Sequence, residues 1–213
     1  MSDYSNTFTE STGDTIDTTD FSTEFSAIET AIATKADSAS PTLTSPTLSS
    51  PTITGFAGGT LTLTSETATT SGTTVDITSI PSWVKKITVL FALVDTDGTS
   101  FPIIQLGDSG GIEATGYLGS AFTSANASTS TIGIIFSKRT VSTSPISGAV
   151  TLYLQDSANN TWVASGTTCT QGGEPCSTAS LKPLSAALDR IRLTTTNGTD
   201  AFESGAVSLV YEG

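Results

Sequence analysis

One stretch of the sequence decides the fold class: Trp83-Val84-Lys85-Lys86-Ile87-Thr88-Val89-Leu90-Phe91-Ala92-Leu93-Val94. It begins with apolar residues at alternating positions and is continuously apolar from Val89 onward. Alternation with a period of two is typical of a β-strand, and a short continuous apolar run is typical of a strand with both faces buried. We therefore expect residues 84–94 to form a central strand that is covered on both faces.

Further β-type runs flank this strand along the chain. They are short and are separated by Gly, Asn, Asp or Pro, the residues that favour turns. Many short strands with such turns predict a mostly β domain over residues 56–213, built as a β-sandwich of the jelly-roll type. The runs cover residues 60–64, 73–77, 103–106, 131–136, 149–155, 161–164, 191–195 and 206–211.

The N-terminal part of the chain has a different composition. Residues 1–37 carry eight acidic residues against Lys35 alone, so we expect residues 1–19 to form an acidic arm that becomes ordered on a partner. In residues 20–37, apolar side chains at spacings of 4, 3 and 4 lie along one stripe of a helix. The stripe predicts a short homo-oligomeric coiled coil, and the alternative is a helix packed on its own domain. Its members are Phe21, Phe25, Ile28 and Ile32.

Residues 38–55 repeat a Ser-Pro-Thr-Leu pattern with a period of five. Each repeat has one large apolar residue, which is Leu43, Leu48 or Ile53. This period fits neither a strand nor a helix, and the prolines remove backbone donors that a central strand needs. We expect extended chain that forms a thin shaft when parallel copies bring the apolar layers together. The alternative is a semi-rigid linker.

Composition excludes several classes of function. A net charge of −12 with eight basic residues leaves no cationic surface for nucleic acid. No apolar run approaches about 18 residues, so we expect no membrane insertion. The absence of histidine removes histidine-dependent triads and the usual zinc ligands, and we expect no cofactor and no metal.

Cys169 and Cys176 form either a disulfide that staples residues 170–175 or two inert thiols.

Carboxylate pairs are the remaining route to catalysis, because glycoside hydrolysis can use two of them. Asp95 and Asp97 are the closest pair of carboxylates in residues 56–213, but their spacing before Gly98 is more typical of a turn. A calcium site that also used Asp108 would need more oxygen ligands, and no calcium-hand pattern is present. Residues 107–111 predict a tight glycine turn instead of a phosphate-binding loop. We therefore predict no catalytic residue.

Short motifs spread over nearly the whole chain carry a resemblance. The N-terminal ones are Gly13-Asp14-Thr15-Ile16-Asp17-Thr18-Thr19-Asp20-Phe21, Phe25-Ser26-Ala27-Ile28 and Thr34-Lys35-Ala36-Asp37, followed by the Ser-Pro-Thr-Leu repeat. Those of the head are residues 101–113, 188–195 and 207–212. Together they resemble the tail fibres, or short receptor-binding fibres, of tailed bacteriophages, and the head motifs are similar to stretches in fibres of aquatic and cyanobacterial phages.

The resemblance implies a homotrimeric structural protein of the virion, made in the host cytoplasm. By this resemblance, residues 1–37 attach to tail or baseplate proteins and the C-terminal head contacts the host-cell surface. One alternative is a purely structural fibre or decoration protein without receptor binding. A glycan-degrading tailspike is less favoured, because such spikes usually need a large repetitive β-solenoid and the chain has no matching repeat.

Adhesion to a host-surface glycan or protein uses aromatic faces and polar side chains on loops that a rigid sheet holds. We expect these loops at the distal end of the head, away from the shaft. Three aromatic residues next to glycine- or asparagine-rich loops are the candidates for exposed contacts, together with four polar neighbours. They are Tyr117, Phe122 and Trp162, with Glu113, Asn126, Asn159 and Asn160.

Overall fold

The computed structural model describes residues 22, 23, 25–30, 61–139 and 141–213. The chain divides into two compact units, Met1–Gly55 and Phe56–Gly213. Several predictions lie outside the described residues: the acidic arm of residues 1–19, the shaft of residues 38–55, and the apolar positions Phe21, Ile32, Leu43, Leu48 and Ile53.

The described part of the first unit is helical at residues 22, 23 and 25–30. The hydroxyl of Thr30 donates a hydrogen bond to the backbone carbonyl of Ser26 at 2.8 Å. Phe25 and Ile28, the two members of the apolar stripe that are described, are 63% and 37% exposed. The helix is confirmed over these residues, and the coiled coil stays a prediction.

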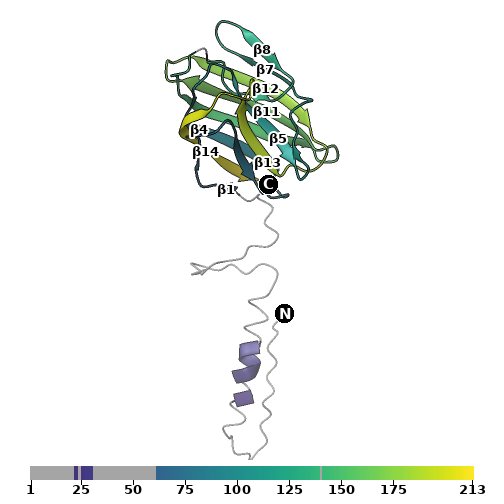
Figure 1. The fold of residues 1–213 in the computed structure, drawn as a ribbon. Helices are drawn as coiled ribbons and strands as arrows, with labels where there is room; N and C mark the ends of the chain where they lie inside the picture. The colour runs from purple at the N-terminus through teal and green to yellow at the C-terminus, as the bar shows by residue number, and fades with distance from the viewer. Residues whose placement is uncertain (1–21, 24, 31–60, 140) are drawn as a thin grey trace, which may run out of the picture. The chain divides into compact units, whose positions relative to one another are not determined.

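The second unit is mostly β, as predicted, and all its strand pairs are antiparallel (Figure 1). Over the described residues, the larger sheet has nine strands in the order β1-β14-β4-β10-β11-β12-β7-β8, with β2 paired to β14. Its strands are β1 (Leu61–Leu63), β2 (Thr67–Ala68), β4 (Lys86–Thr96), β7 (Leu118–Phe122), β8 (Ala127–Ser130), β10 (Ile146–Asp156), β11 (Thr161–Thr170), β12 (Pro175–Pro183) and β14 (Phe202–Glu212).

In the part of the chain that the structure describes, the smaller sheet has five strands in the order β3-β13-β5-β6, with β9 paired to β5. Its strands are β3 (Val75–Thr78), β5 (Pro102–Asp108), β6 (Gly111–Ile112), β9 (Ile134–Ile135) and β13 (Arg190–Thr195). Buried residues from both sheets belong to one hydrophobic cluster, to which β4 gives Val89 and β13 gives Leu193. Within it, the rings of Phe91 and Phe136 stack with centroids 4.2 Å apart.

Each strand expected from the sequence overlaps an observed one, while β2, β6, β7, β8 and β12 were not expected. The longest of these is β12, whose sequence PCSTASLKP has few large apolar residues. Its inward positions are nevertheless buried, because they lie over the core between β11 and β7. They are Cys176, Thr178, Ser180 and Lys182.

Strand β4 corrects one prediction. It is central in hydrogen bonding, between β14 and β10, but Ile87, Val89 and Phe91 are buried while Leu90 and Thr88 on the other face are partly exposed. The expectation of two buried faces is wrong, because no layer of the described chain covers the outer face of the larger sheet. Near its end, Leu93 has a φ of 54° and is 57% exposed.

The strand register defines two ends of the second unit. A row of paired residues crosses seven strands of the larger sheet at the end where the C-terminus lies, close to β1 in Figure 1. We call this the basal end and the opposite end the distal end. The basal end also holds the loops of residues 79–85, 157–160 and 184–189. The row consists of Leu61, Glu212, Lys86, Tyr153, Val163, Leu181 and Leu118.

Candidate functional site

The seven candidate contact residues do not form one site. Phe122 and Asn126 lie at the distal end, in the β7–β8 hairpin beside Ser177 of β12. The other candidates lie at the basal end, because the register places the β10–β11 turn there and hydrogen bonds join residues 184–189 to that turn and to the β5–β6 hairpin. The prediction of a single distal site is therefore wrong for Glu113, Tyr117, Asn159, Asn160 and Trp162.

The sequence predicted that Tyr117 and Trp162 are exposed, and this is wrong. Each is 3% accessible and belongs to the core. The backbone N–H of Leu106 donates to the Tyr117 hydroxyl oxygen at 2.6 Å. Burial raises the pKa of this phenol well above its usual value, so it stays protonated. A unit with few large side chains needs these two inside, and glycine or asparagine nearby did not indicate exposure.

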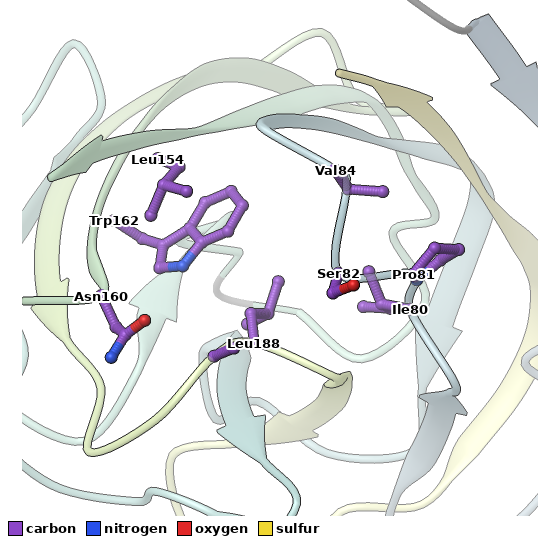
Figure 2. Close-up of a pocket in the computed structure, with 9 residues that line it drawn as sticks. Ile80, Pro81, Ser82, Val84, Leu154, Asn160, Trp162 and Leu188 are labelled. Atoms are coloured by element: carbon purple, nitrogen blue, oxygen red, sulfur yellow. The ribbon is translucent and has the colours of Figure 1, made fainter. Parts of the chain in front are cut away.

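Trp162 forms one wall of a small hollow at the basal end (Figure 2). Three segments far apart in the sequence meet there: the β3–β4 connection, the β10–β11 hairpin and the loop before β13. The cavity volume is about 30 Å³, which is enough to hold a water molecule. The lining residues are Ile80, Pro81, Ser82, Val84, Leu154, Asn160, Trp162, Ala187 and Leu188.

The indole nitrogen of Trp162 is the chemical feature of this hollow. Trp162 Nε1 is buried and has no hydrogen-bond partner in the part of the chain that the structure describes. Figure 2 shows this nitrogen turned towards the space between Asn160 and Leu188. A buried donor that stays unpaired costs about 1 to 3 kcal/mol, so an acceptor oxygen in the hollow would stabilise it.

The turn that carries Asn160 is fixed by its own hydrogen bonds. Asp156 Oδ1 accepts from the backbone N–H of Ala158 at 2.8 Å, and the side-chain amide of Asn159 donates to Asp156 Oδ2 at 2.7 Å. These hydrogen bonds lower the pKa of Asp156, and the bond from the Asn159 amide has the largest effect. Asn160 has a φ of 49°, and its carbonyl accepts from Leu184 N at 3.1 Å. Asn159 thus supports the turn, while the Asn160 amide borders the hollow.

Glu113 is tied to the same end of the unit by structural contacts. It forms an ion pair with Lys182 and accepts a hydrogen bond from Ser185 N at 2.7 Å. Burial alone would raise the pKa of this carboxyl, but the bonds from Lys182 and Ser185 outweigh it and the pKa is lowered. The Lys182 ammonium also lies 5.5 Å from the centre of the Tyr117 ring. These contacts hold the loop before β13 in place.

The distal end, like the basal end, exposes large apolar side chains. Phe122 is 57% exposed, as expected. The Lys138 ammonium donates to the side-chain oxygen of Asn126 and, at 2.8 Å, to its backbone carbonyl, so the hairpin tip is held. Two further exposed apolar side chains at this end, Leu93 and Val141, are 57% and 55% accessible. The exposure of these two side chains was not predicted. Leu93 belongs to an apolar run that indicated a buried strand, and the residues around Val141 do not form a recognisable strand or helix pattern.

The carboxylates considered for catalysis or metal binding are separated. Asp95 pairs with the buried Arg139, and Asp97 Oδ1 accepts from Ala201 N at 2.7 Å, both at the distal end. Asp108 lies at the basal end, in the β5–β6 hairpin. Within the described residues, no group of three or more His, Cys, Asp or Glu side chains could hold a metal ion.

The predicted glycine turn is present between β5 and β6. Asp108 pairs with Gly111, and Asp108 Oδ1 accepts from the backbone N–H of Gly110 at 2.7 Å. Gly111 has a φ of 132°, a conformation that side chains disfavour. Ser185 Oγ donates to the carboxylate of Asp108 at 2.6 Å. This bond is the main reason why the pKa of Asp108 is lowered.

The two cysteines are free thiols in the β11–β12 hairpin. Cys169 is paired with Pro175, and Cys176 with Thr168. Because neighbouring residues of a strand point to opposite faces, one sulfur lies on the outer face of the sheet and the other in the core. The disulfide alternative is therefore wrong for this structure. Of the alternative of two inert thiols, the structure confirms that both thiols are free.

No protein-family model matches this chain, and neither a curated protein nor a solved structure matches it. Among the residues that the structure describes, no helix is long and apolar enough to cross a membrane. An assignment of function therefore depends on the chemistry of the surfaces and of the hollow.

Proposed function

We propose that this chain is the subunit of a homotrimeric, non-enzymatic virion tail fibre of a tailed bacteriophage. Residues 1–37 attach to tail or baseplate proteins, and residues 56–213 form a head that adheres to a host-surface glycan or protein. In this proposal, the two sheets with their common core are the layers of a β-sandwich of the jelly-roll type.

One observation carries the adhesion proposal. At the distal end, opposite the end that holds Leu61, three large apolar side chains are exposed on a fixed framework. They are Phe122, Leu93 and Val141, and each is more than half accessible. Exposed apolar side chains of this kind supply contact area when they meet a partner surface.

The rigidity of the distal loops supports this role. Arg139 donates to the backbone carbonyls of Thr96 and Gly98, both at 2.6 Å, and to that of Ser142 at 3.4 Å. Asp200 Oδ2 accepts from Ser100 N at 2.9 Å. Loops that are already fixed lose little conformational entropy when a receptor binds.

The proposal of a non-enzymatic role draws on the use of the carboxylates. Asp95 neutralises Arg139, Asp97 accepts from the backbone of Ala201, and Glu113 holds Lys182. Each is engaged in holding the fold, whereas glycoside hydrolysis needs a facing pair open to substrate.

Self-association is supported by the outer face of β7, β8, β11 and β12. Its outward-facing residues carry no charge although the chain carries a net charge of −12, so copies can meet there without like-charge repulsion. A shallow groove of about 530 Å³ crosses this face. Its floor includes Leu118, Ser120, Thr129, Val163, Ala179 and Leu181.

Cell adsorption of the full chain tests the adhesion proposal. We expect labelled protein to adsorb to a subset of a panel of bacterial strains, and Phe122→Ser to reduce adsorption. Leu61→Ser is the matched control, because Leu61 is 70% exposed at the basal end and lies outside the face of β7, β8, β11 and β12. Sedimentation equilibrium on the same samples should give a trimer.

Other outcomes favour the rival functions. A trimer that adsorbs to no strain supports a purely structural fibre or decoration protein. Release of sugars from capsule polysaccharide supports a tailspike. Attachment is tested separately: virions assembled with a fibre that lacks residues 2–19 should lose fibre occupancy, and normal occupancy would contradict the role of the arm.

A further inference from the structure

The hollow beside Trp162 has features of a binding site that the adhesion proposal does not use. Trp162 is 3% exposed, and its Nε1 atom has no partner among the described residues. The nitrogen faces a space of about 30 Å³ between Asn160 and Leu188 (Figure 2). An indole N–H can only donate, so whatever satisfies it must present an acceptor atom.

The lining restricts the charge of that acceptor. The walls are apolar side chains such as Val84, Leu154 and Leu188, and none of the described residues that line the hollow is charged. An ionised group would lose its hydration there without a counter-charge, which is costly. A neutral oxygen loses much less, so a hydroxyl or a carbonyl is favoured over a carboxylate or phosphate.

The size and the other polar groups narrow the choice to a hydroxyl. The hollow is small but admits a water-sized group, so a ligand can insert an oxygen with its hydrogen. Ser82 and Asn160 border the same space, and their side chains can both donate and accept. A hydroxyl uses both abilities: its oxygen accepts from Trp162 Nε1, and its hydrogen is donated to the side-chain oxygen of Asn160, which lies beside the indole in Figure 2.

We propose that this basal hollow binds one hydroxyl group of an uncharged polyol, such as a sugar, with Trp162 Nε1 as the buried donor. The sugar hydroxyl enters the hollow, while the rest of the ligand lies outside it. With one inserted group, binding is weak. The inference is independent of the proposed adhesion, which uses the distal end.

The chain contains its own reporters for a test. Its two tryptophans, Trp83 and Trp162, give two indole N–H resonances in a nitrogen–proton correlation spectrum of the full chain. Trp83 is 39% exposed and is not part of the lining, so its resonance is an internal control. A Trp83→Phe variant assigns the remaining resonance to Trp162.

The experiment titrates the full chain separately with glucose, galactose and N-acetylglucosamine. At least one of them should shift the Trp162 resonance saturably while that of Trp83 stays in place, and sodium acetate should not shift it. Asn160→Gly should weaken the affinity about five- to tenfold, the equivalent of one hydrogen bond. Glycine suits the φ of 49° at this position, so the variant keeps the turn.

Several results would overturn the inference. If none of the three sugars moves the Trp162 resonance, or the shift grows without saturation, the hollow holds a buried water only. Equal affinity of Asn160→Gly and the unchanged chain would also contradict it, provided that both unfold at the same temperature. Loss of cell adsorption in Phe122→Ser bears on the distal end alone, so the two proposals can fail separately.

Discussion

Both ends of the head contain buried cations, and the structure holds Arg139 at the distal end differently from Lys182 at the basal end. At the distal end, Arg139 is 1% exposed and its guanidinium donates to Asp95 and to several backbone carbonyls. At the basal end, Lys182 is 4% exposed and its ammonium donates to Glu113 and to one carbonyl, that of Pro183 at 2.8 Å.

The difference lies in what each cation holds. A guanidinium has five donors in a fixed plane, so Arg139 fixes the positions of several chain segments at once. An ammonium is a compact charge on a flexible stem. The carboxylate partner differs too, since the side chain of Asp95 is 11% exposed and that of Glu113 is 24% exposed. We therefore expect the stability of the distal end to depend more strongly on Arg139 than the stability of the basal end depends on Lys182.

The largest effect is expected for Arg139→Met, which keeps the volume and removes the charge. Asp95 is left buried without its partner, and the carbonyls of Thr96 and Gly98 lose their donors. Removing one partner of a buried pair costs about 3 to 5 kcal/mol. Urea denaturation, followed by tryptophan fluorescence, measures the loss.

The control for this variant is the double substitution Arg139→Met with Asp95→Leu. It removes the unpaired carboxylate, so the double variant should lose less stability than the sum of the two single variants. A strictly additive result, or an unchanged midpoint for Arg139→Met alone, would show that the pair does not stabilise the distal end.

A smaller loss is expected for Lys182→Met at the basal end. The variant leaves Glu113 with its bond from Ser185 N and with partial access to water, so the cost should be about 1 to 3 kcal/mol. Lys85→Met is the matched control, because Lys85 is exposed at the same end. If Lys182→Met loses as much as Arg139→Met, the comparison of the two ends is wrong.

Acid should weaken the basal end by a further, smaller amount. The folded-state pKa values of Glu113 and Asp108 lie below their ordinary 4.5 and 3.8. Their contribution to the free energy of unfolding is thus present above those ordinary values and is lost as the pH falls through the folded-state values. The melting temperature should be lower at about pH 3 than at about pH 6.

The variant Glu113→Gln isolates the share of one carboxylate in this acid effect. It cannot ionise, so the difference in melting temperature between the two pH values should shrink. An unchanged difference would mean that other carboxylates carry the whole effect, Asp76, Asp156 and Asp200 among them, whose pKa values are also lowered.

The smallest effect is expected at an exposed pair between β3 and β13. Arg192 donates to both carboxylate oxygens of Asp76, at 2.6 and 2.7 Å, but both side chains are about a third exposed. Exposed pairs contribute about 0 to 1 kcal/mol, so Asp76→Asn should lower the free energy of unfolding by less than about 1 kcal/mol. Urea denaturation at low and high salt checks this, and a loss like that of Lys182→Met would contradict it.

Local patterns explain what the sequence could predict. The expected strands are present because alternation and β-branched residues report the strand conformation directly. Strands β7, β8 and β12 were missed because Ser, Ala, Gly and Thr give weak alternation, and pairing with neighbouring strands supplies their stability instead. The double burial expected for β4 failed because nothing in its own sequence reports whether a second layer exists.

The candidate site depended on non-local information. Which loops share an end follows from the order of the strands, so Phe122 and Trp162 could not be separated in advance. The burial of Lys182 and Arg139 was also hidden, because charged residues normally indicate exposure. The hollow itself joins three segments that no spacing in the sequence relates.

The opposite facing of the two cysteines gives the chain a practical property. Cys169 is exposed on the outer face, whereas Cys176 is 2% exposed and burial raises its pKa, which keeps it in the unreactive thiol form. A maleimide dye will therefore label each folded chain at a single atom, the sulfur of Cys169, without any engineered cysteine. The natural sequence thus supplies a fluorescent attachment point near the distal end of β11.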